Sequence, residues 1–286
     1  MSYDLFFTFP QPVSKMEVET YFLGRPNFQC NGAAVYENAD TGVYFSFNFE
    51  TDDSVQARRL RVAFNLNYFR PHIFGLEAEA EVRAFIERFQ ASVEDPQMHG
   101  MGQGPYSTEK FFSGWNAGNA FGYQAITAQN KGPHLACPEA KMEAAWRWNS
   151  AKRVMQQKFA DTLFVPTVMF GTVDGQLHSL VVWGDGIPML MPQTDLVIIV
   201  RDQLAPKPFF GQRSKDMCLL RPDELDGLLG QFSEMGYPRP TRLIEHIEPS
   251  REITKFIGKL SPFKGQLKVV PVHTVLSQEL LGRCGA

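Results

Sequence analysis

The chain has 286 residues, of which 44% are hydrophobic and 21% are charged, as in an ordinary soluble globular protein. This length allows two domains or one domain built from two halves, and it buries enough surface to fold without a disulfide or a metal. The net charge is −3 and no basic block occurs, which argues against a dedicated nucleic-acid binder and is compatible with a basic partner.

A strand, a short helix and three further strands are expected in the first 70 residues. Period-two alternation identifies the strands, since successive side chains of a strand point to opposite faces. In the clearest strand, phenylalanines alternate with Tyr44, Ser46 and Asn48. The capping-box spacing of Ser14 and Glu17 marks the start of the helix. The expected strands cover residues 2–9, 33–37, 42–50 and 61–69, and the expected helix covers residues 13–23.

An amphipathic helix over residues 77–89 supplies a cover for the phenylalanine-rich strand face. The order of elements predicts an α+β half, in which helices pack on one face of a mostly antiparallel sheet. A second helix, over residues 108–127, carries Gly114, Gly118 and Gly122 at a spacing of four. Glycine costs about 1 kcal/mol inside a helix, so three on one face indicate a close backbone contact. The alternative is that this segment is an irregular functional loop.

The second half of the chain is expected to be another α+β unit. A β-meander over residues 163–201 is its main feature, because Asp174-Gly175 and Asp185-Gly186 lie between apolar runs and Asp-Gly is a strong hairpin signal. The other expected elements are helices over 138–160, 222–235 and 250–260, strands over 218–220, 242–247 and 267–272, and a terminal turn over 277–281. We therefore predict an N-terminal domain of residues 1–130 and a C-terminal domain of residues 131–286, or two halves that pack as one unit.

The sequence has none of the strong local signatures of catalysis. P-loop, dinucleotide-binding, zinc-protease and nucleophile-elbow motifs are missing from it. His134 and Cys137 have the spacing of a metal half-site, but a structural zinc site takes four ligands and no second pair is visible. We therefore expect no metal and no cofactor. The sequence favours a protein that is not an enzyme. It does not support acid–base catalysis, and it does not exclude it.

Cysteine usage and the N-terminal sequence favour the cytoplasm. The four cysteines are far apart and form no CxxC motif, which is typical of free thiols in a reducing compartment. The start, MSYDLFFTFPQP, lacks a basic region and is interrupted by Asp4 and Pro10, so we do not expect a signal peptide. No run approaches the ~18 apolar residues of a membrane span. The cysteines are Cys30, Cys137, Cys218 and Cys284.

The densest polar cluster is NLNYFRPH, residues 65–72. One interpretation is a solvated strand end in which Arg70 pairs with a nearby carboxylate, since antiparallel sheets often leave one face to water. The other is a polar sheet face, including Ser46, on which a protein docks, because Trp, Tyr and Arg are the usual interface anchors. The candidate partner-binding residues are Tyr44, Asn48, Asn65, Asn67, Arg70, His72, Trp183 and Asp185.

Four stretches, MSYDLFF, NYFRPH, FVPT and DGIPMLMP, resemble uncharacterised bacterial cytosolic proteins of the polymorphic-toxin immunity type. The resemblance implies a stoichiometric inhibitor that binds a secreted toxin in the cytoplasm, and it carries over no residue roles. The leading hypothesis is therefore a non-enzymatic immunity protein that binds and neutralises a bacterial toxin. A basic toxin domain is the expected partner, because acidity raises the rate of association with it.

Two alternatives belong to other classes of protein. The first is a small-molecule enzyme or ligand-binding protein, with a pocket between the halves formed by Arg70, His72, Trp183 and Asp185. The second is a structural subunit of a phage-like or secretion assembly.

Overall fold

A computed structural model describes residues 1–52, 59–129, 132–206, 215–234, 236–246 and 248–284. It confirms the α+β class, with helices packed on mostly antiparallel sheets. The chain forms two compact units: unit 1 comprises Met1–Glu139 and Val272–Ala286, and unit 2 comprises Ala140–Pro271. The expected domain boundary between residues 130 and 131 lies outside the described residues. The C-terminal segment belongs to unit 1, which the sequence does not predict.

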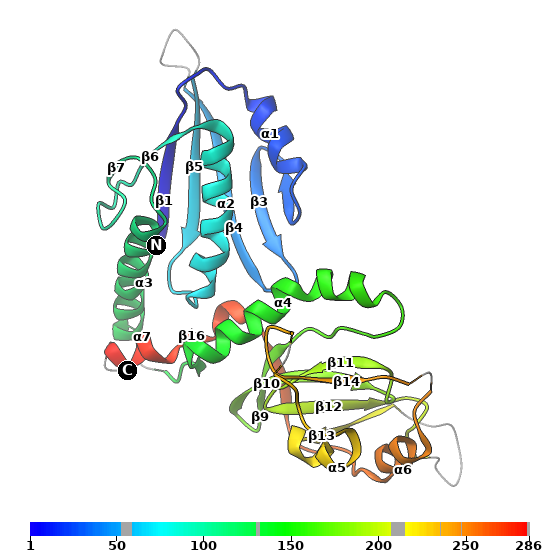
Figure 1. The fold of residues 1–286 in the computed structure, drawn as a ribbon. Coiled ribbons are helices and arrows are strands. Elements are labelled where there is room, and N and C mark those ends of the chain that lie inside the picture. Colours follow the sequence, from blue (N-terminus) through cyan, green and yellow to red (C-terminus); the bar gives the residue numbers. More distant parts are fainter. Residues whose placement is uncertain (53–58, 130–131, 207–214, 235, 247, 285–286) are drawn as a thin grey trace. The chain divides into compact units, whose positions relative to one another are not determined.

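Unit 1 is built on a seven-stranded sheet of order β2-β3-β4-β5-β1-β6-β7, in which each neighbouring pair is antiparallel (Figure 1). The four expected strands are present, and the short strands β2, β6 and β7 add to them. Gly42, with a φ of +73°, adopts a left-handed backbone in the link between β3 and β4. The bounds are β1 (Ser2–Thr8), β2 (Phe28–Cys30), β3 (Ala33–Asn38), β4 (Val43–Asp52), β5 (Arg59–Asn67), β6 (Ser92–Glu94) and β7 (Gln103–Gly104).

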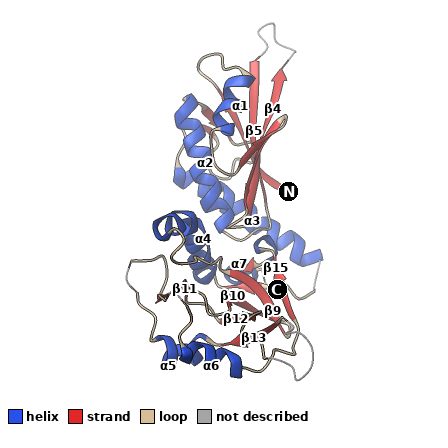
Figure 2. Ribbon diagram, turned by 90° about the vertical axis from the view of Figure 1, so that its right-hand side faces the viewer, coloured by secondary structure: helices blue, strands red, loops and turns tan. Residues whose placement is uncertain are grey.

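Helices cover one face of this sheet, and Figure 2 shows α1 and α2 on the same side of it. Phe22 of α1 and Phe85 of α2 both contact Phe47 of β4, and Phe111 of α3 contacts Phe64 of β5. The phenylalanine-rich strand face is therefore the core of unit 1, as the alternation predicts. The helices are α1 (Lys15–Leu23), α2 (Ile73–Phe89) and α3 (Thr108–Gln129).

The structure confirms the predicted start of α1 and places the start of α2 earlier than predicted. The capping box at Ser14 is confirmed, with Glu17 completing it. Helix α2 begins at Ile73, one turn before the expected residue 77, because Pro71 and His72 already supply carbonyls to the first turn. The glycine-bearing segment is helical throughout α3, so its interpretation as an irregular loop is wrong.

The C-terminal segment packs on α3. Strand β16 (Leu276–Ser277) pairs in parallel with β8 (Ala136–Cys137), and Leu276 and Leu281 bury Tyr123 of α3. The expected terminal turn is the short helix α7 (Gln278–Arg283), preceded by the 3₁₀-helix η2 (Val272–Thr274).

Unit 2 contains a five-stranded sheet of order β13-β12-β10-β9-β15 and a separate two-stranded sheet of β11 and β14. The Asp174-Gly175 hairpin between β9 and β10 is confirmed. The simple meander is wrong, because β11 leaves the sheet to pair with β14, and β12 therefore returns parallel to β10. The strands are β9 (Met169–Val173), β10 (Gln176–Gly184), β11 (Met189–Pro192), β12 (Leu196–Arg201), β13 (Asp216–Leu220), β14 (Thr241–Ile244) and β15 (Leu267–Val270).

One expected helix of unit 2 is largely missing. The helix over residues 222–235 is reduced to a 3₁₀ turn and one α-turn, because Gly230, with a φ of +73°, ends it. No described helix is both long and apolar enough to cross a membrane. The helical segments are α4 (Glu139–Phe159), which begins in unit 1, η1 (Pro222–Leu225), α5 (Asp226–Leu229) and α6 (Arg251–Lys259).

Candidate functional site

The face of the unit 1 sheet that points away from the helices carries polar side chains with some apolar ones among them, and we call it the open face. Its central side chains come from β1, β3, β4 and β5, on the strand positions that alternate with the buried phenylalanines. Directly opposed residues form rows across it. One row is Asp4, Asn65, Ser46 and Val35, and the next is Phe6, Ala63, Asn48 and Ala33.

Asp4 organises the centre of the open face. Its carboxylate accepts hydrogen bonds from Asn65 Nδ2 at 2.5 Å and from Ser2 Oγ at 3.0 Å. Asn48 and Asn67 are exposed, and within the described part of the chain their amides form no side-chain hydrogen bond. Asn65 is thus tied to the sheet, whereas the amides of Asn48 and Asn67 are available to an approaching partner.

The open face carries an excess of negative charge. Among the residues whose side chains the structure describes, Asp4, Glu37 and Glu94 place carboxylates on it, and Arg61 places a cation on it. Such a surface attracts a basic partner over a distance set by the Debye length, about 8 Å at physiological salt.

Arg70 lies where β5 ends, beside Tyr44 of β4. Its Nε donates a hydrogen bond to the Tyr44 hydroxyl at 3.1 Å, and its Nη1 donates to the Phe69 carbonyl at 2.9 Å. The Arg70 Cζ lies 5.7 Å from the centroid of the Tyr44 ring, a cation–π geometry. Among the described residues Arg70 forms no ion pair, so the carboxylate partner expected for it is not found.

His273 of the C-terminal segment completes this cluster. Its ring meets the Tyr44 ring edge-on, with 5.7 Å between the centroids. Burial, and then the positive charge of Arg70, lower the pKa of His273 below its usual value. The imidazole is therefore mainly neutral at pH 7, and Arg70 supplies the positive charge of the cluster.

The backbone beneath Arg70 is held in place by α3. Phe69 has a left-handed φ of +61°, which is costly for a residue with a side chain. Asn119 Oδ1 accepts a hydrogen bond from Phe69 N at 2.8 Å, and Asn119 Nδ2 donates to Arg70 O at 2.9 Å. The Tyr123 hydroxyl donates to the same carbonyl at 3.2 Å. These hydrogen bonds fix the backbone that carries the Arg70 side chain. Less conformational entropy is therefore lost when a partner binds Arg70.

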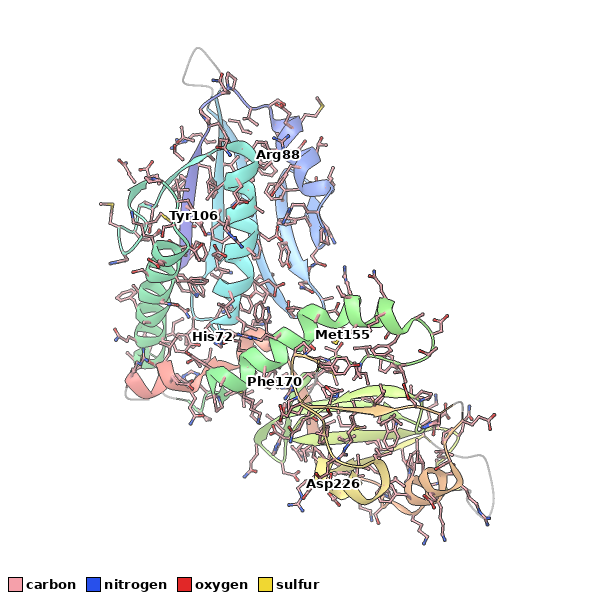
Figure 3. The ribbon with its side chains drawn as sticks, in the orientation of Figure 1. His72, Arg88, Tyr106, Met155, Phe170 and Asp226 are labelled. Carbon is pink, nitrogen blue, oxygen red and sulfur yellow. The ribbon has the colours of Figure 1, made fainter. Side chains whose placement is uncertain are left out.

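The structure brings most of the predicted site residues into unit 1. Tyr44, Asn48, Asn65 and Asn67 lie on the open face, and Arg70 borders it. His72 follows at the N-terminal end of α2, where it is half-buried (Figure 3).

The other two predicted residues belong to unit 2 and have internal roles. Trp183 is fully buried, and its Nε1 donates a hydrogen bond to the Ile187 carbonyl. The Asp185 carboxylate accepts hydrogen bonds from the backbone of Asp202, Gln203 and Leu204. A joint site of these two residues with Arg70 and His72 stays a prediction.

Sequence reasoning missed Asp4 and His273. Asp4 was detectable, since it alternates with buried Tyr3 and Leu5 on a predicted strand. His273 gives no signal, because nothing in the local sequence shows that the C-terminal segment returns to unit 1.

Comparison with known proteins adds no assignment. A scan against protein-family models and searches of curated proteins and solved structures find no match to this chain. Within the described residues, no group of three or more His, Cys, Asp or Glu is placed to hold a metal ion.

Proposed function

We propose that the protein is a non-enzymatic binding protein and that the open face of unit 1 is its docking surface. The observation that carries this proposal is the combination of the exposed amides of Asn48 and Asn67 on the open face with the hydrogen-bonded pair of Arg70 and Tyr44. Tyr and Arg are residues that dominate binding energy at interfaces, particularly when their side chains are fixed before binding.

The partner that best complements this face is a basic protein domain. The carboxylates of Asp4, Glu37 and Glu94 favour it, as does the net charge of −3. The resemblance to polymorphic-toxin immunity proteins points in the same direction. We therefore propose that the protein acts in the bacterial cytoplasm as an immunity protein, neutralising a toxin by stoichiometric binding.

The open face alone is smaller than a standard protein–protein interface. Strands are about 5 Å apart and rise about 3.3 Å per residue, so four strands of six residues present roughly 400 Å². A standard interface buries about 800 Å² on each partner. The contact is therefore expected to extend beyond these strands, over the border formed by Tyr44, Arg70 and His273.

The test is calorimetric binding to each basic toxin domain that a neighbouring gene is found to encode. Replacing Asn48→Arg and Asn67→Arg together puts two positive charges on exposed positions of the open face. We expect at least about tenfold weaker binding, because like charges then oppose each other. Asn116→Arg, on an exposed position of α3, is the matched control and retains full affinity. If no neighbouring toxin forms a tight complex, the proposal fails.

A further inference from the structure

Unit 2 contains a pocket of about 680 Å³ that the proposed function does not use. This volume lies within the range of small-molecule sites, roughly 300–1,000 Å³. Its walls come from the end of α4, the turn that follows α4, and the adjoining ends of β11 and β14. The lining includes Phe159, Asp161, Leu163, Pro188, Glu245 and His246.

Backbone hydrogen bonds hold these walls together. Phe164 N donates to the Pro188 carbonyl at 3.1 Å, which joins the turn after α4 to the start of β11. His246 Nε2 lies 2.7 Å from the Gly186 carbonyl, which joins the end of β14 to the turn before β11. The pocket is therefore built from three segments in fixed positions rather than from a single open loop.

The charges in the pocket are of one sign. Asp161 and Glu245 contribute carboxylates, and no Lys or Arg is among the lining residues. Neither carboxylate forms an ion pair within the part of the chain that the structure describes. The Lys158 ammonium lies 5.7 Å from the centroid of the Phe159 ring without pairing with either of them. Lys158 therefore already supplies a cation to the Phe159 ring.

Apolar surface surrounds the carboxylates. Leu163 and Pro188 line the pocket, while Ile187 next to it is 40% exposed. Leu243 of β14 is 46% exposed and precedes Glu245 by two residues. A ligand that matches this pattern combines a positive charge with an apolar stem.

We propose that this pocket binds an organic cation, an ammonium or guanidinium group on an apolar stem. The carboxylates of Asp161 and Glu245 accept charge-assisted hydrogen bonds from the cationic head. The Phe159 ring, Leu163 and Pro188 cover the apolar stem. A free amine and a lysine or arginine side chain of another protein share this chemistry. The pocket shares no lining residue with the open face of unit 1.

The experiment is an NMR and calorimetric titration of the full chain with n-hexylammonium, with hexanoate as the probe of opposite charge. The test variant carries Asp161→Asn and Glu245→Gln. The control carries Glu234→Gln and Glu248→Gln, which remove two exposed carboxylates outside the pocket lining. We expect saturable binding of n-hexylammonium to the wild type and the control, at least about tenfold weaker binding to the test variant, and no binding of hexanoate. Thermal unfolding of each variant verifies that it is folded.

Two further probes separate the sources of the cation. Binding of 1,4-diaminobutane alone indicates a free amine, whereas binding of N-acetyl-lysine methylamide alone indicates a protein side chain. The proposal is overturned if hexanoate binds as well as n-hexylammonium, or if the folded test variant binds like the wild type. It is equally overturned if none of the cationic probes binds the wild type saturably.

Discussion

Gly118 of α3 faces Tyr68 so closely that a Cβ at this position would come within 2.1 Å of the tyrosine hydroxyl oxygen. A Cβ at Gly114 would come within 2.6 Å of the Tyr3 hydroxyl, and one at Gly122 within 3.1 Å of the Tyr68 Cβ. The three glycines, spaced four residues apart, therefore leave room for the side chains of Tyr3 and Tyr68 against α3. Their role in the structure is packing of α3 against β1 and the end of β5.

Replacement of Gly118→Ala is expected to destabilise unit 1 by about 3 kcal/mol, because the methyl group overlaps a buried ring that has little room to move. Urea unfolding followed by circular dichroism measures the change. Gly258→Ala is the control, since this glycine lies in helix α6 with nothing within 4 Å of the added Cβ. It is expected to raise stability by up to about 1 kcal/mol. Equal stability of Gly118→Ala and the wild type would contradict the packing.

Glu77 is a buried carboxylate that fixes the β3–β4 hairpin to α2. It accepts hydrogen bonds from the Tyr36 hydroxyl at 2.6 Å, Asn38 Nδ2 at 2.7 Å and the Thr41 hydroxyl at 3.0 Å. Glu77→Ala leaves these donors without this acceptor and is expected to cost about 3 kcal/mol, whereas Tyr36→Phe removes one donor and costs about 1 kcal/mol.

Chemical denaturation of both variants measures these costs. Glu87→Ala serves as the control, because Glu87 is exposed on the same helix. A loss no larger for Glu77→Ala than for Glu87→Ala would show that the hydrogen bonds of Glu77 contribute little.

Asp195 is expected to make the stability of unit 2 fall at acid pH. Burial alone raises the pKa of Asp195, but hydrogen bonds from Lys141 and Ser179 outweigh it and hold the pKa below the usual 3.8. A carboxyl whose folded pKa is lowered contributes stability above its unfolded pKa, and this contribution is lost as the pH falls through the folded value.

Asp195→Asn is therefore expected to lower the urea midpoint at about pH 6 and to reduce the loss of stability between about pH 6 and about pH 3. Asp202→Asn, in an exposed pair with Lys215, is the control and changes little. The same acid dependence in wild type and Asp195→Asn would rule out this role for Asp195.

Asn119 couples α3 to the border of the open face. Asn119→Ala removes the bonds to Phe69 N and Arg70 O, and the left-handed backbone at Phe69 then lacks its support. We expect a loss of about 3 kcal/mol and, in the folded variant, weaker partner binding because Arg70 is less fixed. Asn116→Ala on the exposed side of the same helix is the control. Unchanged stability and binding in Asn119→Ala would show that the loop holds its conformation without Asn119.

The sequence predicts what depends on local pattern. Alternation identified β4 and β5 and the face that each buries, so it placed Asn48, Asn65 and Asn67 together correctly. Alternation within a strand does not show which other strand pairs with it. The parallel pairing of β10 and β12 is therefore not predicted from the sequence. Asp185 is a charged residue near a tryptophan in the sequence, which suggests a binding site. In the structure its carboxylate instead accepts hydrogen bonds from the backbone of residues 202–204, which are distant in sequence.

The central claim is tested most directly by capture of the protein from its native host. Tagged wild type, the Asn48→Arg/Asn67→Arg variant and the Asn116→Arg control are purified in parallel, and co-purifying proteins are quantified by mass spectrometry. The account predicts one stoichiometric basic protein with the wild type and the control, and its loss from the open-face variant. No stoichiometric partner of the wild type, or the same partner held equally by all three, would contradict the account.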